Sequence, residues 1–500
     1  MDIIRNFPMM TIILSLFSGS LCFVLKGKTA RYYTIFFEIF LLVVCGAILW
    51  YTVTTGTSVT YPMGEFPAPW GNEIRAGILE ALLATLFMLI MIVSVLAGYS
   101  FIDMDLDESK VNLYYAILNL MTSSLMAILW TNDLFSGYVF LEILTLTSCG
   151  SLIVREIGRT TLAAVRYMIL NLLGSGLFLL GVVLLYDLTG HLLMVPMQQT
   201  IAEMAQDPRL FMVLTLSTGV LTVGLSIKSG LFPFHFWMPD SYGWSTPTSA
   251  SILSSLVSKA YIVLLIKVIY RAIGLEVFEK MPIRNLFLVL GIMGMVIGSI
   301  QAMHADNINR MVAFSSAAQV GYIFMGMGLG GPAGYTAAIF HIMAHAVTKS
   351  MLFLTTPRLA EVAGDSLLFN KLQASALKNQ DAGFFFLVGS MSMIGIPLFA
   401  GFSSKLQFAL AGVESGSHAK LISVILALAA SSLLNAIYFM RTLIRIYSVP
   451  NGPGRKVIVR TRHRLDYNAP MAVLVALNLF LGLFSWVAID LIGRGLEMFG

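Results

Sequence analysis

Apolar residues fill the chain in long runs, and short polar stretches separate these runs. Most runs contain about 20 residues or more, which is the length of α-helix that crosses about 30 Å of hydrocarbon. The pattern therefore predicts an all-α membrane protein with about fourteen membrane-spanning helices. Their approximate ranges are 8–25, 34–54, 78–101, 112–131, 134–154, 162–186, 210–240, 248–270, 285–303, 311–330, 333–356, 381–413, 420–440 and 469–490.

The polar stretches between the runs are the size of loops, and none resembles a linker between domains. The longest are 187–208, 358–380 and 441–468. We therefore expect one polytopic membrane domain over residues 1–500. The first run is expected to be a retained helix and not a signal peptide, because basic residues follow it and no small-residue cleavage site is present.

Composition and charge agree with this class. Hydrophobic residues make up 57% of the chain and charged residues 11%, with a mean hydropathy of +0.83, which excludes an ordinary soluble protein. Lysine and arginine are concentrated in alternate loops, above all in the run RKVIVRTRHR at 455–464. The positive-inside rule places these loops in the cytoplasm and both termini outside, in a cell (inner) membrane. Nucleic-acid binding is the weaker alternative, because topology alone explains a basic cytoplasmic loop.

The sequence contains no pattern that predicts a cofactor. Cys22, Cys45 and Cys149 lie in separate apolar runs, so we expect buried thiols and neither a disulfide framework nor a metal cluster. Walker loops, nucleophile triads and the spacings of haem or iron–sulfur ligands are not found. We therefore expect no catalytic chemistry in this chain, and we expect ion gradients or a partner protein to supply the energy for transport.

Five ionisable residues lie well inside apolar runs, namely Glu142, Lys228, Lys259, Lys349 and Lys405. Each would cost about 2.5–3.5 kcal/mol near a helix centre if it faced lipid. They must therefore face one another, water or backbone dipoles. For any one of them a structural ion pair, or a chain extended to the interface, is the alternative, but five such residues favour a function.

Proton exchange is the chemistry that a buried lysine offers. Burial disfavours the ammonium form and a nearby carboxylate restores it, whereas arginine does not deprotonate in proteins. Glu142 is the expected partner of Lys228. Weakening their interaction would release a proton from the lysine, and restoring it would favour uptake.

Two of the predicted spans contain helix breakers beside these lysines. Pro233 follows Lys228, and Gly395, Pro397 and Gly401 precede Lys405. We expect Pro233 to kink the helix and to leave backbone polar groups unpaired beside Lys228. Such backbone is tolerated inside a membrane only where protein or a wet cavity surrounds it, as in the discontinuous helices of transporters.

Histidines lie between the two breaks. His341, His345 and Lys349 recur at i, i+4 and i+8, so they share one helix face and can relay protons. Structural hydrogen bonds to neighbouring helices are the alternative, and a two-histidine metal site lacks an evident third ligand. His235, two residues after Pro233, is expected to face the kink or the cytoplasmic mouth.

Several further polar residues are candidates for auxiliary roles. Lys267 lies near a predicted span end, where its chain could extend to the interface. Glu38 and Glu80 are also expected at interfacial positions. Hydroxyl and amide groups could hold water between the charged sites, or could pack helices. These residues are Ser254, Ser255, Ser258, Ser315, Ser316 and Gln319.

Five motifs in this order resemble a known family, the antiporter-like subunits of respiratory complex I, membrane-bound hydrogenases and Mrp-type sodium/proton antiporters. They are SGYVFLEILTLTS, KSGLFPFHFWMPDSYG, NRMVAFSSAAQVGY, HIMAHAVTKSMLF and GIPLFAGFSSKLQF. The likeness covers roughly residues 60 to 450. Within the family, residues 61–83 and Lys405 most resemble the D-type Mrp subunit and its hydrogenase relatives.

The resemblance implies a fourteen-helix fold with two inverted five-helix repeats, at about 110–275 and 283–447, and broken helices 7 and 12. It also implies a hydrated polar axis at mid-membrane. By motif, Glu142 corresponds to the carboxylate of helix 5, Lys228 to its partner on helix 7 and Lys259 to the bridging lysine of helix 8. His345 and Lys349 correspond to the relay of helix 11, and Lys405 to the terminal lysine of helix 12.

These features predict a proton-translocating subunit of a multisubunit Na+/H+ antiporter complex, whose partners are other membrane subunits. The alternative is the same channel inside a redox-driven complex of the hydrogenase or NADH:quinone oxidoreductase type. A purely structural subunit is a third possibility. The unusually basic loop 441–468 leaves open which complex contains the chain.

Overall fold

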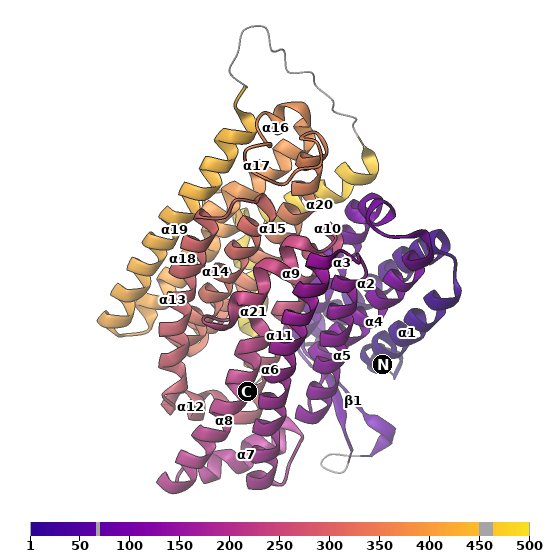
Figure 1. The fold of residues 1–500 in the computed structure, drawn as a ribbon. Coiled ribbons are helices and arrows are strands. Elements are labelled where there is room, and N and C mark those ends of the chain that lie inside the picture. The colour runs from indigo at the N-terminus through magenta and orange to yellow at the C-terminus, as the bar shows by residue number, and fades with distance from the viewer. Residues whose placement is uncertain (1, 67–70, 450–463, 500) are drawn as a thin grey trace.

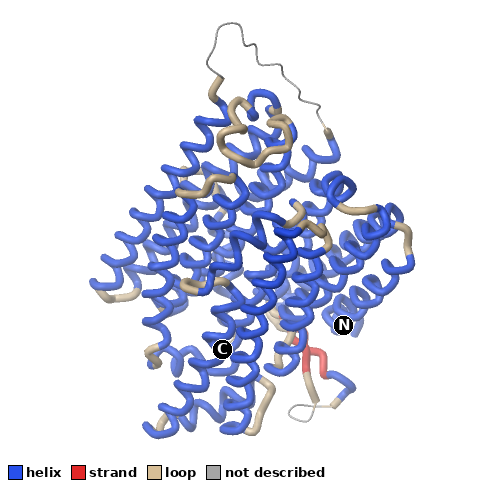
Figure 2. Tube along the Cα trace, in the orientation of Figure 1, coloured by secondary structure: helices blue, strands red, loops and turns tan. Residues whose placement is uncertain are grey.

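The computed structural model describes residues 2–66, 71–449 and 464–499. Helices dominate this part of the chain (Figures 1 and 2). The predicted all-α membrane fold is therefore confirmed. Most of the basic run at 455–464 lies outside the described residues.

The helices follow one another with short connections. Those of the first third are α1 (Asp2–Val24), α2 (Gly27–Thr55), α3 (Ile78–Asp105), α4 (Val111–Trp130), α5 (Leu134–Ile153), α6 (Gly158–Thr189) and α7 (Met194–Met204). Those of the middle are α8 (Pro208–Ser229), α9 (Met238–Trp244), α10 (Pro247–Ile252), α11 (Ser258–Lys267), α12 (Leu275–Lys280), α13 (Ile283–Met303) and α14 (Ile308–Leu329). The last are α15 (Gly331–Glu361), α16 (Ser375–Lys378), α17 (Gln380–Ile394), α18 (Ala400–Glu414), α19 (His418–Tyr447), α20 (Leu465–Leu483) and α21 (Ser485–Glu497).

Short 3-10 or π-helical turns join some of these helices. They are η1 (Met63–Glu65), η2 (Glu108–Lys110), η3 (Phe234–Trp237), η4 (Leu253–Val257) and η5 (Val268–Gly274). The last two are π-helical and flank α11. π-Helical turns are rare and are found frequently at functional sites.

Among the described residues, 13 helical segments are long and apolar enough to cross a membrane. They correspond to every predicted span except 381–413. That stretch is present as α17 and α18, which contain 15 residues each and are separated by a break. The predicted span 469–490 is shorter than expected, because α20 ends at Leu483 and α21 begins at Ser485. The total of fourteen spans stays a prediction.

Both predicted interruptions are present. α8 ends at Ser229, Gly230 has a φ of 74°, and α9 begins only at Met238. α17 ends at Ile394, and Gly395 has a φ of 92°. Glycine adopts this left-handed conformation without the steric cost of a side chain, so the chain leaves one helix and starts another inside the bundle.

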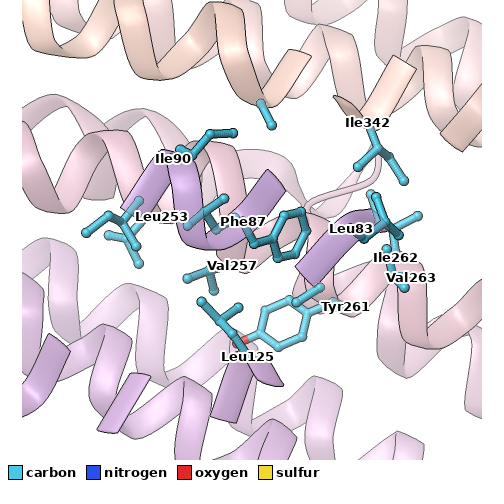
Figure 3. Close-up of a cluster of buried hydrophobic side chains, with 14 of the residues drawn as sticks. Leu83, Phe87, Ile90, Leu125, Leu253, Val257, Tyr261, Ile262, Val263 and Ile342 are labelled. Atoms are coloured by element: carbon cyan, nitrogen blue, oxygen red, sulfur yellow. The ribbon is translucent and has the colours of Figure 1, made fainter. Parts of the chain in front are cut away.

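Three spans form the middle of the molecule. The most apolar stretch of Pro247–Lys280 and of Gly331–Glu361 is completely buried, and 94% of that of Ile308–Leu329 is buried. Figure 3 shows how side chains of α3, η4, α11 and α15 pack together there. A charged side chain on these spans is therefore surrounded by protein and not by lipid.

A β-hairpin links α2 to α3. Strand β1 (Val59–Pro62) pairs antiparallel with β2 (Glu73–Ala76), and Val59 lies opposite Ala76. The hairpin and α7 lie at one end of the helix bundle, and α16 lies at the opposite end (Figure 1). Arg75 Nη2 donates a hydrogen bond to the carbonyl of Met498, so the hairpin holds the C-terminal segment over this end.

Candidate functional site

Lys228 is fully buried on the last turn of α8, in contact with α5 and α6. Its ammonium Nζ donates a hydrogen bond of 2.6 Å to Thr145 Oγ1 and lies 5.3 Å from the ring centroid of Tyr261. The Thr145 and Tyr261 hydroxyls are 3.3 Å apart. A hydroxyl acceptor and an aromatic face therefore surround the charge.

Glycines let α6 and α8 approach closely enough to seat this lysine. A β carbon at Gly224 would lie 2.6 Å from the Gly174 carbonyl oxygen. A β carbon at Gly174 would lie 3.0 Å from Cγ of Lys228. The lysine stem therefore passes directly over the Gly174 position.

Glu142 lies one turn before Thr145 on α5, so the two side chains share a helix face. It is partly exposed and close enough to Lys228 for an electrostatic interaction. Among the described residues, no ion pair within 4.0 Å joins Glu142 to Lys228. The expected partners are thus neighbours without direct contact, and Lys228 bonds to Thr145 instead.

Two carbonyls at the first break have hydrogen-bond partners. The carbonyl of Ser226 accepts from the backbone N–H of Leu231, and that of Ile227 accepts from Gly230 N–H and from Trp237 Nε1. These carbonyls are therefore not left unpaired beside Lys228. The indole of Trp237 satisfies the helix end, which the position of Pro233 did not predict.

Polar contacts extend from Lys259 to Lys349 through Ser254, Ser316 and Val312. Lys259 Nζ donates to the Ser254 carbonyl at 2.6 Å, and Ser254 Oγ lies 2.9 Å from Ser316 Oγ. Ser316 Oγ donates to the Val312 carbonyl at 3.1 Å, and Lys349 Nζ donates to the same oxygen at 2.9 Å. All five residues are buried. Each lysine therefore donates to a backbone carbonyl, and the paired hydroxyls of Ser254 and Ser316 join the two segments that carry these carbonyls.

His341 and His345 stack on α15, with ring centroids 5.9 Å apart and planes 9° apart. His341 Nδ1 lies 2.7 Å from Ser404 Oγ, and the ring stacks on Tyr322. Among the described residues, neither ring nitrogen of His345 has a hydrogen-bond partner, and His341 Nε2 has none either. Buried polar atoms without a protein partner are the atoms that ordered water normally satisfies.

The two histidine rings also lie within range of the charges of three lysines. The ring of His345 interacts with the charges of Lys259 and Lys349, and that of His341 with Lys259 and Lys405. These five residues therefore form one electrostatic group, although they come from α11, α15 and α18.

Lys405 binds to the backbone at the second break, where α17 ends. Its Nζ donates to the carbonyls of Met393 at 3.3 Å and Ile394 at 2.6 Å, at the end of α17. A helix C-terminus favours a cation through its free carbonyls and its dipole. Asn435 Nδ2 also donates to the Met393 carbonyl, at 3.3 Å.

Ser315 is linked to the surroundings of Lys405 through Tyr438 and Asn435 of α19. The Tyr438 hydroxyl lies 2.6 Å from Asn435 Oδ1 and 2.9 Å from Ser315 Oγ. Gln319, one turn further along α14, is buried, and its Nε2 has no partner among the described residues. Both residues therefore line the region between the histidines and Lys405.

His235 is buried in η3, where its Nε2 lies 2.7 Å from Gln301 Oε1 of α13. Its ring stacks on that of Phe236. Among the described residues, no hydrogen bond joins it to Lys228. The structure therefore places His235 at the first break but separates it from the lysine.

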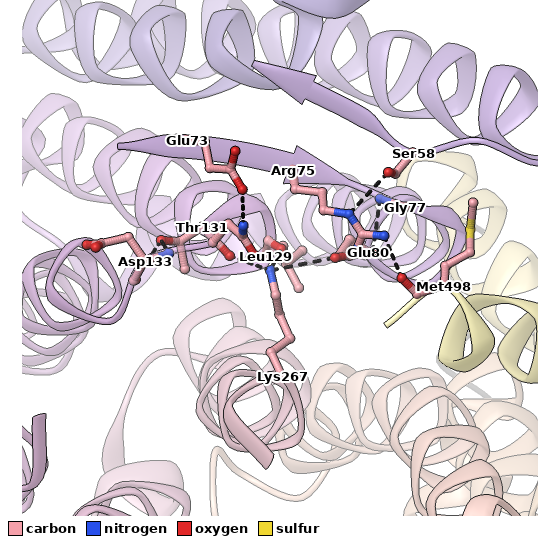
Figure 4. A network of polar contacts seen from close by, with 11 residues as sticks. Ser58, Glu73, Arg75, Gly77, Glu80, Leu129, Thr131, Asp133, Lys267 and Met498 are labelled. Atoms are coloured by element: carbon pink, nitrogen blue, oxygen red, sulfur yellow. Dashed lines mark hydrogen bonds and ion pairs between the residues drawn. The ribbon is translucent and has the colours of Figure 1, made fainter. Parts of the chain in front are cut away.

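Lys267 is not at an interface, and the prediction for it is wrong. Lys267 and Glu80 are each about 1% exposed, with Nζ and Oε1 3.7 Å apart (Figure 4). Lys267 also donates to the carbonyls of Leu129 and Thr131, at 2.5 and 2.7 Å. The hairpin and the C-terminal segment cover this end of the helices, so the span end lies inside the protein.

The other two carboxylates differ. Glu80 lies in the first turn of α3, at a span end as expected, but is buried there as the partner of Lys267. Glu38 is buried against Thr122 of α4, because α2 begins at Gly27, well before the predicted start, and places Glu38 deep in the span. Outside the spans, burial raises the pKa of the Asp133 carboxyl, although it accepts a 2.6 Å hydrogen bond from Ser136 N–H.

The sequence did not single out several residues that complete these contacts. Thr145, Tyr261, Ser404, Asn435 and Tyr438 are buried polar residues in apolar helices. For Thr145, the spacing of three from Glu142 was the available signal. Ser404 and Tyr261 lie beside Lys405 and Lys259 in sequence, whereas Asn435 and Tyr438 come from α19, which carries no predicted site residue, so only the fold brings those two to the site. Among the described residues, no group of three His, Cys, Asp or Glu could hold a metal ion.

Comparison with known proteins agrees with this architecture. Residues 131–433, more than half of the chain, match the family described as NADH:quinone oxidoreductase/Mrp antiporter, TM. The N subunit of the NADH-quinone oxidoreductase of Desulforudis audaxviator is 28% identical over 450 residues, which cover 87% of this chain and 86% of that protein. The D subunit of the Na(+)/H(+) antiporter of Bacillus subtilis is 26% identical over 448 residues, which cover 89% and 87%.

A solved structure shows the same fold. A chain in the structure of the Mrp complex from Dietzia sp. superposes with a TM-score of 0.87 at 21% identity, over 99% of this chain and 97% of that one. The chain is thus a multi-pass membrane protein with the fold of a subunit from a multisubunit complex. It belongs to the NADH:quinone oxidoreductase/Mrp antiporter family.

Proposed function

We propose that this chain is the proton-translocating subunit of a multisubunit Na+/H+ antiporter complex. The residues that carry protons, here called the polar axis, are Glu142, Lys228, Lys259, His341, His345, Lys349 and Lys405. The single observation that carries the proposal is the series of contacts from Lys259 through Ser254, Ser316 and Val312 to Lys349, in three spans whose most apolar stretches are 94% or 100% buried.

The geometry supports a stepwise transfer. Each lysine ammonium already donates to a hydroxyl or carbonyl oxygen, and the stacked histidines present ring nitrogens without protein partners among the described residues. A proton released by one group can pass through serine hydroxyls and bound water to the next. Glu142 is close enough to Lys228 for their charges to interact, so a change in their separation would release or capture a proton.

The order of helices supports the two repeats at about 110–275 and 283–447. Apart from the short helix α7, the first region contains α4, α5, α6, the broken pair α8 and α9, and the segment that starts with α10. Apart from the short helix α16, the second contains α13, α14, α15, the broken pair α17 and α18, and α19. When only these longer segments are counted, the break falls in the fourth member of each set, as expected for repeats related by a symmetry axis.

We also propose that the end bearing α16 faces the cytoplasm and that both termini lie outside the cell. The support is the positive-inside rule, because basic residues gather in the loops at the α16 end. A protease-sensitive tag on the C-terminus tests this. It should be cleaved in intact cells, and cleavage only in inverted vesicles would reverse the orientation.

The alternative places the same axis in a redox-driven complex, and the relative from the NADH-quinone oxidoreductase of Desulforudis audaxviator favours it. Co-purification distinguishes the two. Only small membrane subunits should accompany the chain if it belongs to an antiporter. Soluble partners with iron–sulfur clusters would instead show a redox-driven pump.

Ion flux in vesicles that contain the assembled complex tests the proposed function itself. Lys228→Ala and Glu142→Gln should assemble but lose proton transport, and Glu142→Gln should also change the pH dependence of any residual flux. Lys371→Ala, in an exposed loop, is the matched control and should transport normally. Normal flux in Lys228→Ala would show a purely structural subunit.

A further inference from the structure

Glu38 is a buried carboxyl group that the polar axis does not use. It lies in the middle of α2 and is fully buried where α2 packs against α1 and α4. Polar side chains gather at this junction of three helices. They are Ser18 and Cys22 of α1, Thr34 of α2, and Asn119 and Thr122 of α4.

The hydrogen bonds around Thr122 indicate where a proton sits. Thr122 Oγ1 lies 2.7 Å from Glu38 Oε1 and 3.1 Å from the carbonyl of Leu118. The hydroxyl has one hydrogen, and the carbonyl can only accept. Threonine in a membrane helix commonly donates to the carbonyl four residues earlier. A single hydrogen on Thr122 cannot serve both contacts, so when it is directed at Leu118 the hydrogen in the 2.7 Å contact comes from Glu38.

The surroundings of Glu38 do not compensate a negative charge. Among the described residues, no Lys, Arg or His forms an ion pair with Glu38, and Oε2 has no hydrogen-bond partner. Arg31, which precedes it on α2, is paired with Asp103 at 2.7 Å. An ionised carboxylate with a single hydrogen bond would be costly at this depth, whereas a neutral acid would not.

The neighbouring groups are also unsuited to a metal cation, which needs several oxygen ligands. Asn119 presents its amide nitrogen to Thr34 Oγ1 at 2.8 Å and to Cys22 Sγ at 3.5 Å. Its Oδ1 accepts from Ser18 at 2.9 Å. Oxygens that could complete a coordination shell are therefore already used.

We propose that Glu38 is a second proton-binding site, separate from the polar axis. It is a carboxylic acid that holds its proton on Oε1 and donates it to Thr122. This proton links α2 to α4, and the inference does not depend on the transport function proposed above.

Infrared spectroscopy of the purified complex at neutral pH tests this directly. A protonated carboxyl and an ionised carboxylate absorb in separate regions. Glu38→Gln keeps the size and the donor of the acid, and should remove one band of a protonated carboxyl that shifts in D2O. Glu80→Gln is the control, because Glu80 is paired with Lys267, and should remove only carboxylate bands. Loss of carboxylate bands in Glu38→Gln would overturn the proposal.

A second variant covers the case in which Glu38→Gln does not assemble. Thr122→Val removes the acceptor and leaves the acid in place. The difference spectrum against the wild-type protein should then show a shifted band in the protonated region. A change confined to the carboxylate region would overturn the proposal equally.

Discussion

The hydrogen bond between Lys228 and Thr145 joins α8 to α5, the helix that carries Glu142. Thr145→Val removes the hydroxyl and keeps the shape of the side chain. A buried hydrogen bond to a charged group contributes roughly 1.5–3 kcal/mol, so we expect proton flux to fall about tenfold or more. Flux into vesicles that contain the assembled complex measures this.

Thr147→Val is the matched control, because Thr147 lies on the same helix and bonds only to its own backbone, at Ile143 and Leu144, within the described part of the chain. It should leave flux within a factor of about two, as expected for a side chain that bonds to its own helix. Equal losses in the two variants would show that the Thr145 hydroxyl has no specific role.

The buried pair of Lys267 and Glu80 makes a prediction about stability. Lys267→Met leaves an uncompensated buried carboxylate and should destabilise the complex by roughly 3–5 kcal/mol. Adding Glu80→Leu should recover most of this loss. Thermal unfolding of the purified complex measures both.

The exposed pair of Lys110 and Glu156 provides the comparison. Lys110→Met should leave the unfolding temperature of the complex almost unchanged, because solvent screens an exposed pair. A double variant at Lys267 and Glu80 that is no more stable than the single variant would contradict the assignment of the pair.

The cost of burying a charge explains why the sequence could predict candidate residues of the polar axis but misplaced other charges. A lysine such as Lys259 inside an apolar run is costly, so its presence indicates a protein-lined or wet site. Glu38 and Lys267 lie nearer the predicted span ends, where burial and exposure to water give the same pattern. Only the covering hairpin and the early start of α2 decide between them.

At the scale of helices, the sequence predicted where α8 and α17 end but not how their ends are satisfied. Gly230 and Gly395 terminate the helices because their backbone is left-handed. The two breaks then differ, since Trp237 satisfies a carbonyl at the first and Lys405 at the second. Such partners come from the next element, so local sequence patterns do not reveal them.

The close contact between α6 and α8 predicts a sensitive position. Gly174→Ala places a β carbon 2.8 Å from the Gly224 carbonyl oxygen and 3.0 Å from Lys228 Cγ. Overpacking of this kind costs typically about 1–3 kcal/mol. We expect lower thermal stability of the complex together with reduced proton flux, because α8 and its lysine must move.

Gly176→Ala is the control on the same helix. A β carbon at Gly176 has no atom within 4 Å among the described residues, so stability and flux should both be retained. If Gly174→Ala behaves like Gly176→Ala, the close approach of the two helices does not position Lys228.

At the scale of the molecule, the part of the axis from Lys259 to Lys349 runs through spans that other helices surround. By contrast, only 39% and 33% of the most apolar stretches of α1 and α2 are buried, so these helices face lipid or another subunit. Hydropathy could predict the spans and their order along the chain. It could not predict that Ser254 and Ser316 meet between η4 and α14, since that contact depends on how distant segments pack.

Proton flux through Lys259→Met tests the central claim most directly, because Lys259 begins the serine-linked path to Lys349. The purified complex is reconstituted into vesicles with a trapped pH-sensitive dye, beside the wild-type protein and the exposed-loop control Lys371→Met. The account predicts that Lys259→Met assembles and loses proton flux, while the control transports at the wild-type rate. Wild-type flux in a correctly assembled Lys259→Met complex would contradict it.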